Sequence, residues 1–475
     1  MTLSERLDSS PLVGITRRAL DGGDGVWIVG GAVRDAALGR EVTDLDLAVA
    51  GDPERAVKAV ACEGDGHAFE LSAEFKTWRA VARDRSWQVD ATALRGEAIG
   101  SDLAARDFTL GAVAVPLDGG EPVDPYGGIA DLERGLLRAV SDDSFRDDPL
   151  RLLRAARLAV DLALEVDPAT AARARLDSAL AAEPAGERQL AELRRLIGGS
   201  DPLRGVALLD ELGLTAVVLP ELEALRGVEQ GPNHHLDVLG HTLAVLERML
   251  EVESDLERFA GERAAETQAL LEEPLADEMT RGTALRFGAL FHDIGKPATR
   301  GERDGYVTFV GHDSTGAEII GGICGRLRAS GRLTRHLKGL TQHHLRLGFL
   351  VHEAPLPPRR VHEYLRATEP VAADVTLLTV ADRLSARGSG PFATEEAIEA
   401  HLRLARQMLA AALDWRRDGP PEPLLRGDEL AEELGIAQGP ELGDLLAELE
   451  GAQYAGEVGT RADAVERARR LRGSP

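Results

Sequence analysis

The sequence predicts an α+β fold, in which a mixed sheet with helices near the N-terminus is followed by a helical remainder. Short runs rich in β-branched and apolar residues occur before residue 95, and each has the length of an ordinary strand. From Asp167 onward the apolar spacing is helical with polar breaks, and no strand signal follows in the middle of the chain. The composition agrees, because Ala, Leu, Arg and Glu are abundant and only 4% of the residues are aromatic.

The length of 475 residues suggests about three domains. The order of motifs described below divides the chain further into four predicted segments. These are a head at 1–140, a helical neck and body at 141–230, a histidine-rich domain at 231–395 and a helical tail at 396–475.

The net charge of −25 excludes a protein that neutralises nucleic-acid phosphates with its whole surface. Contacts to RNA must then come from local clusters of arginine. Cys62 and Cys324 are too few for a disulfide framework, which favours a reducing compartment. There is no N-terminal basic segment with an apolar core and no apolar run of about eighteen residues. We therefore expect a cytoplasmic protein.

The head is centred on a Gly-Gly turn and a pair of aspartates. The predicted strand at 26–29 leads into Gly30 and Gly31, and the next strand carries Asp44 and Asp46 on one face. Two neighbouring carboxylates repel each other unless a divalent cation lies between them, and Mg²⁺ prefers such oxygen ligands. Glycines in the turn let backbone N–H groups approach a triphosphate. The pattern predicts metal-assisted phosphoryl or nucleotidyl transfer.

A third carboxylate follows on a further predicted strand. The segments 76–82 and 86–94 have the length and composition of paired strands, and Asp90 lies in the second. Asp90 is a candidate third carboxylate of this site. A solvated aspartate at a strand end is the alternative.

A basic helix begins the second segment. Asp148 suits the N-cap position and Pro149 the first helical position. Arg151, Arg154 and Arg157 recur at every third residue, and a guanidinium offers a planar set of donors to phosphates and bases. The alternative is a capped helix with a solvated arginine face.

The third segment contains histidines and aspartates whose side chains would converge only in a helical bundle. Imidazole and carboxylate together suit Zn²⁺, Mn²⁺, Ni²⁺ or Fe. A single buried histidine is more often structural, but a set this large that includes an adjacent His-Asp pair favours a metal site. The candidates are His241, His292, Asp293, His312, His343, His344 and Asp382.

The strings Gly-Gly-Ala-Val-Arg-Asp and Asp-Leu-Asp-Leu-Ala-Val closely resemble the head of the class II tRNA nucleotidyltransferases, or CCA-adding enzymes, and of bacterial poly(A) polymerases. These enzymes belong to the DNA polymerase β superfamily, so the resemblance implies a head of that type. It also implies that two Mg²⁺ ions bind the aspartate pair. The residues implied to position the nucleotide in this part of the head are Gly30, Gly31, Arg34 and Asp35.

Two later motifs extend the resemblance. Arg106 and Asp107 match a family motif that contacts the ribose and phosphates of the nucleotide, although Gly111 replaces its Asn. A surface Arg–Asp pair is the alternative. Asp148 and Arg151 match the Glu-Asp-x-x-Arg motif, which implies that they read the Watson–Crick edge of CTP or ATP.

The histidine-rich segment resembles the HD phosphohydrolase superfamily. The order His241, His292-Asp293 and Asp382 implies a first metal, and His312 with His343 or His344 would support a second. Many tRNA nucleotidyltransferases carry such a domain.

The resemblance implies that CMP, and AMP in some members, is added to the 3′ end of tRNA from CTP and ATP. The segment 91–105 is short, as in enzymes that add only CC, so CCA, CC and A addition stay open. The alternatives are a poly(A) polymerase acting on general RNA, a phosphohydrolase or 2′,3′-cyclic phosphodiesterase with a vestigial RNA-binding head, and a protein that only binds RNA.

Overall fold

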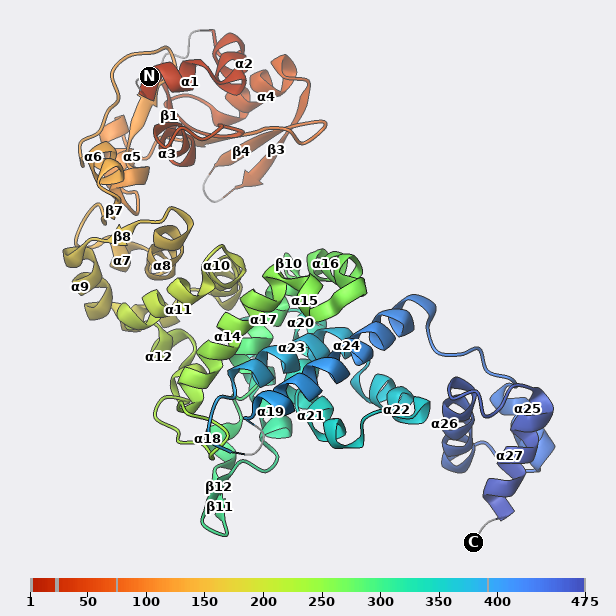
Figure 1. Ribbon diagram of the computed structural model, residues 1–475. Coiled ribbons are helices and arrows are strands. Elements are labelled where there is room, and N and C mark those ends of the chain that lie inside the picture. The colour runs from red at the N-terminus through yellow and green to blue at the C-terminus, as the bar shows by residue number, and fades with distance from the viewer. Residues whose placement is uncertain (1–2, 22–24, 74–75, 391–392, 474–475) are drawn as a thin grey trace. The chain divides into compact units, whose positions relative to one another are not determined.

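The computed structural model describes residues 3–21, 25–73, 76–390 and 393–473. The chain forms two compact units, Met1–Val218 and Leu219–Pro475, whose elements are labelled in Figure 1.

The first unit is built on a six-stranded mixed sheet with the order β3-β4-β5-β2-β1-β6. Strands β2 and β5 pair in parallel, and the other neighbours pair in antiparallel fashion. The predicted strands at 76–82 and 86–94 are confirmed as β4 and β5. The edge strand β3 was not predicted; most of its residues are exposed and none is fully buried. The strands are β1 (Val26–Val29), β2 (Asp44–Val49), β3 (Gly66–Ser72), β4 (Thr77–Ala82), β5 (Gln88–Ala93) and β6 (Ala114–Pro116).

Helices α1 (Leu3–Asp8), α2 (Pro11–Ala19) and α4 (Pro53–Glu63) lie together beside the sheet, and α4 packs on β3, β4 and β5 (Figure 1). Helix α4 begins where Asp52 accepts a hydrogen bond from the Glu54 N–H. Alternate residues of β2 and β5, among them Leu45 and Val89, are buried in this core. Their opposite faces are left for the site.

The remaining elements of the first unit are mostly helices, of which α3 and α5 connect strands of the sheet and the others follow it. One short parallel pair, β7 with β8, lies before Asp167, where the predicted helical pattern begins. The elements are α3 (Gly31–Ala37), α5 (Ile99–Ala104), α6 (Gly128–Glu133), β7 (Leu136–Leu137), α7 (Ser144–Asp147), α8 (Arg151–Asp161), β8 (Glu165–Val166), α9 (Pro168–Leu176), α10 (Gly186–Gly198), α11 (Pro202–Glu211) and α12 (Thr215–Val218).

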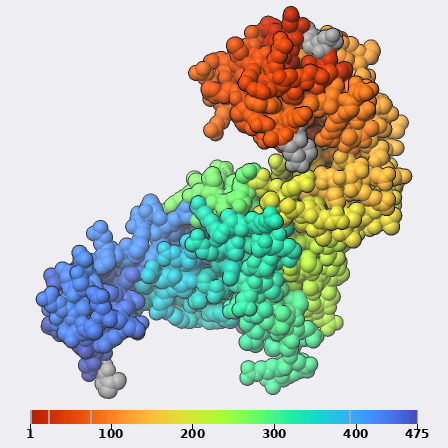
Figure 2. Space-filling view, turned by 180° about the vertical axis from the view of Figure 1, so that it is seen from behind, coloured from red at the N-terminus to blue at the C-terminus, as the bar shows by residue number. Residues whose placement is uncertain are grey.

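The second unit is largely helical, with two short antiparallel pairs, β9 with β10 and β11 with β12. The β11–β12 hairpin projects from the helices of this unit, as both views show (Figures 1 and 2). The elements up to the hairpin are α13 (Pro220–Glu223), α14 (Val238–Ser254), α15 (Leu256–Ala260), α16 (Ala264–Glu272), β9 (Pro274–Ala276), β10 (Met279–Thr280), α17 (Arg281–Phe291), α18 (Lys296–Thr299), β11 (Gly301–Arg303) and β12 (Tyr306–Thr308).

After the hairpin, a bundle of long helices leads to a tail of three helices with its own apolar core. The helices are α19 (His312–Arg326), α20 (Gly331–His343), α21 (Arg346–Leu350), α22 (Pro358–Thr368), α23 (Ala372–Ser385), α24 (Glu395–Asp418), α25 (Gly427–Leu434), α26 (Pro440–Tyr454) and α27 (Arg461–Gly473).

Among the described residues, no helix combines the length and apolar character needed to cross a membrane. Cys62 and Cys324 are both free thiols.

Gly295 lets α18 approach the start of α19, because a Cβ there would lie 2.2 Å from the His312 carbonyl oxygen and 2.6 Å from the Gly316 nitrogen. We expect Gly295→Ala to lower the free energy of unfolding by about 1–3 kcal/mol or more, since backbone atoms must move apart. Gly322→Ala is the control, because nothing lies within 4 Å of a Cβ on this α19 residue. Urea unfolding checks both, and equal stability of the two variants would contradict the prediction.

Candidate active sites

The register of the sheet places carboxylates side by side. Asp46 on β2 is the direct partner of Asp90 on the parallel strand β5. Asp44 and Asp46 are exposed on one face of β2, while Leu45 and Leu47 between and after them are buried. Three carboxylates therefore lie close together on the open face of the sheet.

These carboxylates have few cations to neutralise them. Asp90 forms a two-bond ion pair with Arg79 of β4, at 2.7 Å for each bond. Burial and the Asp90 charge raise the pKa of Asp46 above its ordinary value, and burial likewise raises that of Asp44. A divalent cation would relieve this repulsion, and hard oxygen donors are the set that Mg²⁺ prefers. The residues present fit the predicted ion.

The Gly-Gly turn closes directly on the aspartates. Gly30 has φ +66°, and a Cβ there would lie 2.9 Å from Asp46 Oδ2 and 3.2 Å from Arg106 Nη1. The Gly31 N–H donates to Asp46 Oδ2 at 3.4 Å. The turn thus requires glycine, and it lies close to both a carboxylate and a guanidinium. The next two candidates, Arg34 and Asp35, pair with each other through two bonds of 3.0 Å.

Arg106 and Asp107 are each held by a neighbouring side chain. Arg106 donates to the buried Asp102 at 2.9 and 3.1 Å. Asp107 Oδ2 accepts from Arg154 at 2.6 and 2.9 Å. Burial opposes ionisation of Asp107, but the Arg154 charge outweighs it and keeps the Asp107 pKa below its ordinary value. Asp107 is therefore ionised at pH 7, and both side chains are held by hydrogen bonds.

Arg151 clamps the backbone that carries this pair. Its Nη2 donates to the Ala105 carbonyl oxygen at 2.6 Å, and its Nη1 donates to Ser144 Oγ at 3.0 Å. Helix α8 itself begins at Arg151. Asp148, predicted as its N-cap, lies just before it in extended conformation and accepts from the Leu150 N–H at 3.2 Å. Asp148 therefore caps a turn that precedes the helix, and α8 begins two residues later than the sequence predicts.

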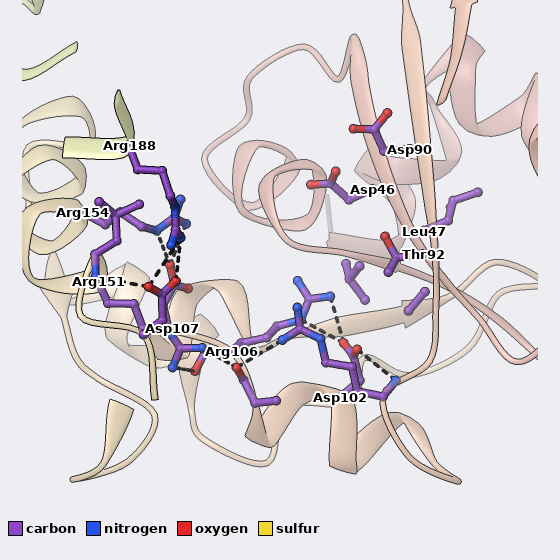
Figure 3. A pocket seen from close by; sticks show the side chains of 16 residues that line it. Asp46, Leu47, Asp90, Thr92, Asp102, Arg106, Asp107, Arg151, Arg154 and Arg188 are labelled. Carbon is purple, nitrogen blue, oxygen red and sulfur yellow. Dashed lines mark hydrogen bonds and ion pairs between the residues drawn. The ribbon is translucent and has the colours of Figure 1, made fainter. Parts of the chain in front are cut away.

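One cavity is lined by Asp46 and Asp90 as well as by the arginines, and Asp44 lies outside its lining. Its volume is about 340 Å³, within the range of small-molecule sites. In Figure 3, Asp46 and Asp90 extend from the strands on one side, and Arg151, Arg154 and Arg188 lie on the helical side. Arg106 and Asp107 line the cavity between them. The cavity can therefore place a metal-bound triphosphate and a base within one enclosure.

Two arginines do not follow the sequence prediction. Arg157 does not line the cavity, because it is buried and pairs with Glu192 at 2.5 Å and Asp161 at 2.9 Å. Arg188 on α10 does line it and donates to Asp148 Oδ2 at 3.1 Å. No motif marks Arg188 in the sequence, since it comes from a helix far along the chain.

A second site lies in the helices of the other unit. Two triads have ligand atoms within 4.8 Å of one another; one is His241, His292 and Asp382, and the other is Asp293, His312 and His344. Asp293 links them, because its Oδ2 lies 3.1 Å from His292 Nε2 and its Oδ1 lies 3.3 Å from His312 Nε2. The sequence left His343 and His344 as alternative ligands of the second metal, and the structure places His344 in the second triad. His343 lies outside both triads, and its Nδ1 accepts from Arg346.

The histidines are oriented for metal binding. His292, His312 and His344 each place Nδ1 within 2.6–2.9 Å of the carbonyl oxygen three residues earlier. A proton on Nδ1 leaves Nε2 free as a ligand. Burial lowers the pKa of His344 to about 4, so this imidazole is neutral at pH 7. The donor set fits a divalent transition metal.

Two groups beside the triads, one buried and one half-buried, were not assigned from the sequence. Lys296 follows the His-Asp pair closely in the chain and contacts Asp293 Oδ2 at 2.6 Å. The ring of His234 lies edge-on to His241 with centroids 4.5 Å apart. Burial lowers the pKa of His234 to about 3. In the sequence, the pair of adjacent histidines at 234–235 is the feature that could have indicated His234.

The sheet with its carboxylates and the paired histidine triads define a polymerase-type nucleotidyltransferase head joined to an HD domain. Family models agree: the poly A polymerase head domain matches residues 26–138, the "Probable RNA and SrmB- binding site of polymerase A" matches 163–225, and the HD domain matches 238–387. The chain belongs to the class II tRNA nucleotidyltransferase and poly(A) polymerase family.

Curated relatives match along most of the chain. The A-adding tRNA nucleotidyltransferase of Deinococcus radiodurans is 35% identical, covering 93% of this chain and 94% of that protein. The CC-adding tRNA nucleotidyltransferase of Thermus thermophilus is 34% identical, covering 92% and 91%. The multifunctional CCA protein of Xanthomonas campestris is 31% identical, covering 87% and 97%.

Solved structures share the fold. A CCA-adding enzyme in complex with ATP aligns with a TM-score of 0.66 at 19% identity, covering 99% of both chains. The Thermotoga maritima CCA-adding enzyme in complex with tRNA aligns with a TM-score of 0.60 at 18% identity, covering 99% of this chain and 98% of that one.

His401 gives the second unit a pH-dependent stability. It is buried on α24 beside Thr379 Oγ1 at 3.1 Å, and burial, with the Arg383 charge, lowers its pKa from 6.5 to about 4, although Asp382 opposes this. Unfolding therefore takes up a proton between pH 6.5 and 4. We expect the free energy of unfolding to fall by about 1 kcal/mol from this group between pH 7.5 and 5.5.

The measurement is urea unfolding at the two pH values for the wild type and for His401→Gln. The variant should lose less stability on acidification than the wild type. An identical pH slope in the two proteins would contradict the assignment to His401.

Proposed function

We propose that the chain adds nucleotides of the CCA terminus to the 3′ end of tRNA, using CTP, ATP or both and releasing pyrophosphate. The observation that carries this proposal is the single cavity that holds Asp46 and Asp90 opposite Arg151 and Arg154. The activities for which the Deinococcus, Thermus and Xanthomonas relatives are named support it. The free thiols and the absence of a disulfide framework favour a cytoplasmic setting.

Asp44 and Asp46, with Asp90 beside them, would hold Mg²⁺. The chemistry that bound Mg²⁺ supplies is a lower pKa for the terminal 3′-hydroxyl and neutralisation of the triphosphate charge. The protein supplies position: the turn at Gly30 and Gly31 offers backbone N–H groups at the edge of the carboxylates. The neighbouring Arg34–Asp35 pair would hold the nucleotide from the same side.

Base selection falls to Asp148 and Arg151, as the family motif implies. Asp148 presents a carboxylate that accepts from Arg188, and it can accept from the amino group of cytosine or adenine in the same way. Arg151 would have to share donors that now bind the backbone of 105–106. Arg106, Asp107 and Arg154 would contact the sugar and phosphates. Arg157 is left out, because it is buried and paired elsewhere.

The first test removes one carboxylate. We expect Asp46→Asn, and likewise Asp44→Ala, to lower nucleotide incorporation by about a thousandfold or more, since a metal contact contributes several kcal/mol to the transition state. The control is Asp84→Asn, at a turn of the same unit, where the amide oxygen can still accept from the Ser86 N–H. Far-UV circular dichroism should show equal folding. Full incorporation by Asp46→Asn would remove the assignment.

The product is found by offering one nucleotide at a time to tRNA transcripts that end before CCA, after C and after CC. Incorporation of CMP on the transcripts that end before CCA and after C identifies CC addition. Incorporation of AMP on the transcript that ends after CC identifies A addition. Incorporation of both nucleotides on their respective transcripts identifies CCA addition. Equal use of an unrelated RNA 3′ end would identify a poly(A) polymerase instead.

The paired triads favour a second activity, hydrolysis of phosphate esters at the HD site, including 2′,3′-cyclic phosphodiesters. A divalent transition metal, Ni²⁺, Mn²⁺, Zn²⁺ or Fe, would be held by His241, His292 and Asp382 and by the second triad, and its chemistry when bound is activation of water. The chain's own residues orient the ligands, through the Nδ1 bonds to carbonyl oxygens described above.

Hydrolysis at the HD site can be tested independently of nucleotide addition. We expect His292→Ala to abolish phosphatase activity and to lower the metal content measured by mass spectrometry, because a buried ligand is lost. His343→Ala is the matched control from the helix that precedes His344. CMP or AMP incorporation should be unchanged in both variants. Phosphatase activity that survives His292→Ala would assign the hydrolysis to another site.

A further inference from the structure

A second cavity opens beside the HD triads. It is about as large as the first, near 340 Å³, and its lining includes the triad residues His344 and Asp382. Arg383, the residue after Asp382 on α23, also lines it. A guanidinium therefore shares a cavity with residues from both triads.

Arg383 is a cation that lacks a partner. Its Nε is buried and has no hydrogen-bond partner, and across the described part of the chain no carboxylate forms an ion pair with it. The adjacent Asp382 carboxylate is engaged with His241 Nε2 at 3.1 Å. Four residues further on, Arg387 contrasts with it, because its Nη1 bonds Glu395 at 2.5 Å. A half-buried charge without a partner is costly, so the site is suited to an anion that comes from outside the chain.

The Asp382 carboxylate lines the same cavity but is engaged with His241, so it forms no ion pair with Arg383. His401, on the neighbouring helix α24, also lines the cavity and is neutral, with a pKa lowered to about 4 by burial and by the Arg383 charge. Its Nε2 is engaged with Thr379. Among the described residues that line the cavity, Arg383 is the one arginine or lysine.

The same cavity offers an apolar surface. Leu345 and Phe349 line it, and the Phe349 side chain is 71% exposed on the short helix α21. An exposed aromatic ring at the edge of a polar cavity is suited to pack against an apolar or flat organic group. The lining thus combines an anion site, metal-binding residues and an organic-group site.

We propose that Arg383 binds the phosphate of a phosphomonoester at the HD site, and that the organic part of this ester packs against Phe349. The planar donors of arginine match phosphate oxygens in two-bond geometry, which a water molecule or a chloride ion cannot use. This proposal rests on the HD site of the proposed second activity, and it names the residues that would recognise its substrate.

The test measures binding rather than turnover. Isothermal titration calorimetry of the full chain, with metal content measured in the same samples, uses inorganic phosphate and the non-hydrolysable phenylphosphonate. We expect Arg383→Gln to weaken both ligands by about tenfold or more, since charge-assisted hydrogen bonds are lost. Arg383→Lys should retain part of the affinity. Arg387→Gln, which removes the same charge from outside the cavity lining, should bind both ligands as the wild type does.

A second variant tests the organic-group site. Phe349→Ala should weaken phenylphosphonate several-fold and leave inorganic phosphate unchanged. Unchanged phosphate affinity in Arg383→Gln, an equal loss in Arg387→Gln, or loss of bound metal in Arg383→Gln would each overturn the proposal. Absence of phosphatase activity in the wild type, with binding that still depends on Arg383, would overturn the second activity and leave this proposal standing.

Discussion

The parallel pairing of β2 with β5 decides where chemistry can occur in the first unit. It sets Asp46 beside Asp90 against their mutual repulsion. The register is held by the opposite face, where Leu45 and Val89 are buried in the core. A slip of one residue would bury the carboxylates and expose the leucine. Burial of each large apolar side chain on that face contributes about 1.5–3 kcal/mol, so several together outweigh the repulsion, which Arg79 also reduces by pairing with Asp90.

The arginines of α8 show how the chain orders its own nucleotide site. Most hydrogen bonds that Arg154 and Arg151 donate go to Asp107 and to the backbone at 105–106. They thereby fix the segment that carries Arg106, which lies against the Gly30 turn. A basic helix that looks like a free phosphate-binding surface in the sequence is, in the folded chain, also a positioning device. The donors still open to a ligand are therefore fewer than the number of arginines suggests.

The sequence predicts the parts whose signal is local. Strands β1, β2, β4 and β5, the glycine turn and the HD histidines each follow from a run or a motif. The sequence places Arg157 on the same basic face as Arg151 and Arg154, but its direction in the folded helix differs. A three-residue step falls short of a 3.6-residue turn, so Arg157 points about 120° away from Arg151 and meets Glu192. Arg188 and the unpaired Arg383 come from helices brought in by tertiary packing, and no local pattern marks them.

The HD site depends on charge balance in the same way as the head depends on register. Asp293 and Asp382 bring two negative charges into the second unit, and Lys296 supplies one positive charge to Asp293. The burial of His344 keeps its imidazole neutral at pH 7 and available as a ligand rather than as a cation. Buried charges persist only when they are paired or bound to a metal. Because the two oxygens of Asp293 face different triads, a single carboxylate couples both halves of the site, and a cation bound at one half changes the charge felt at the other.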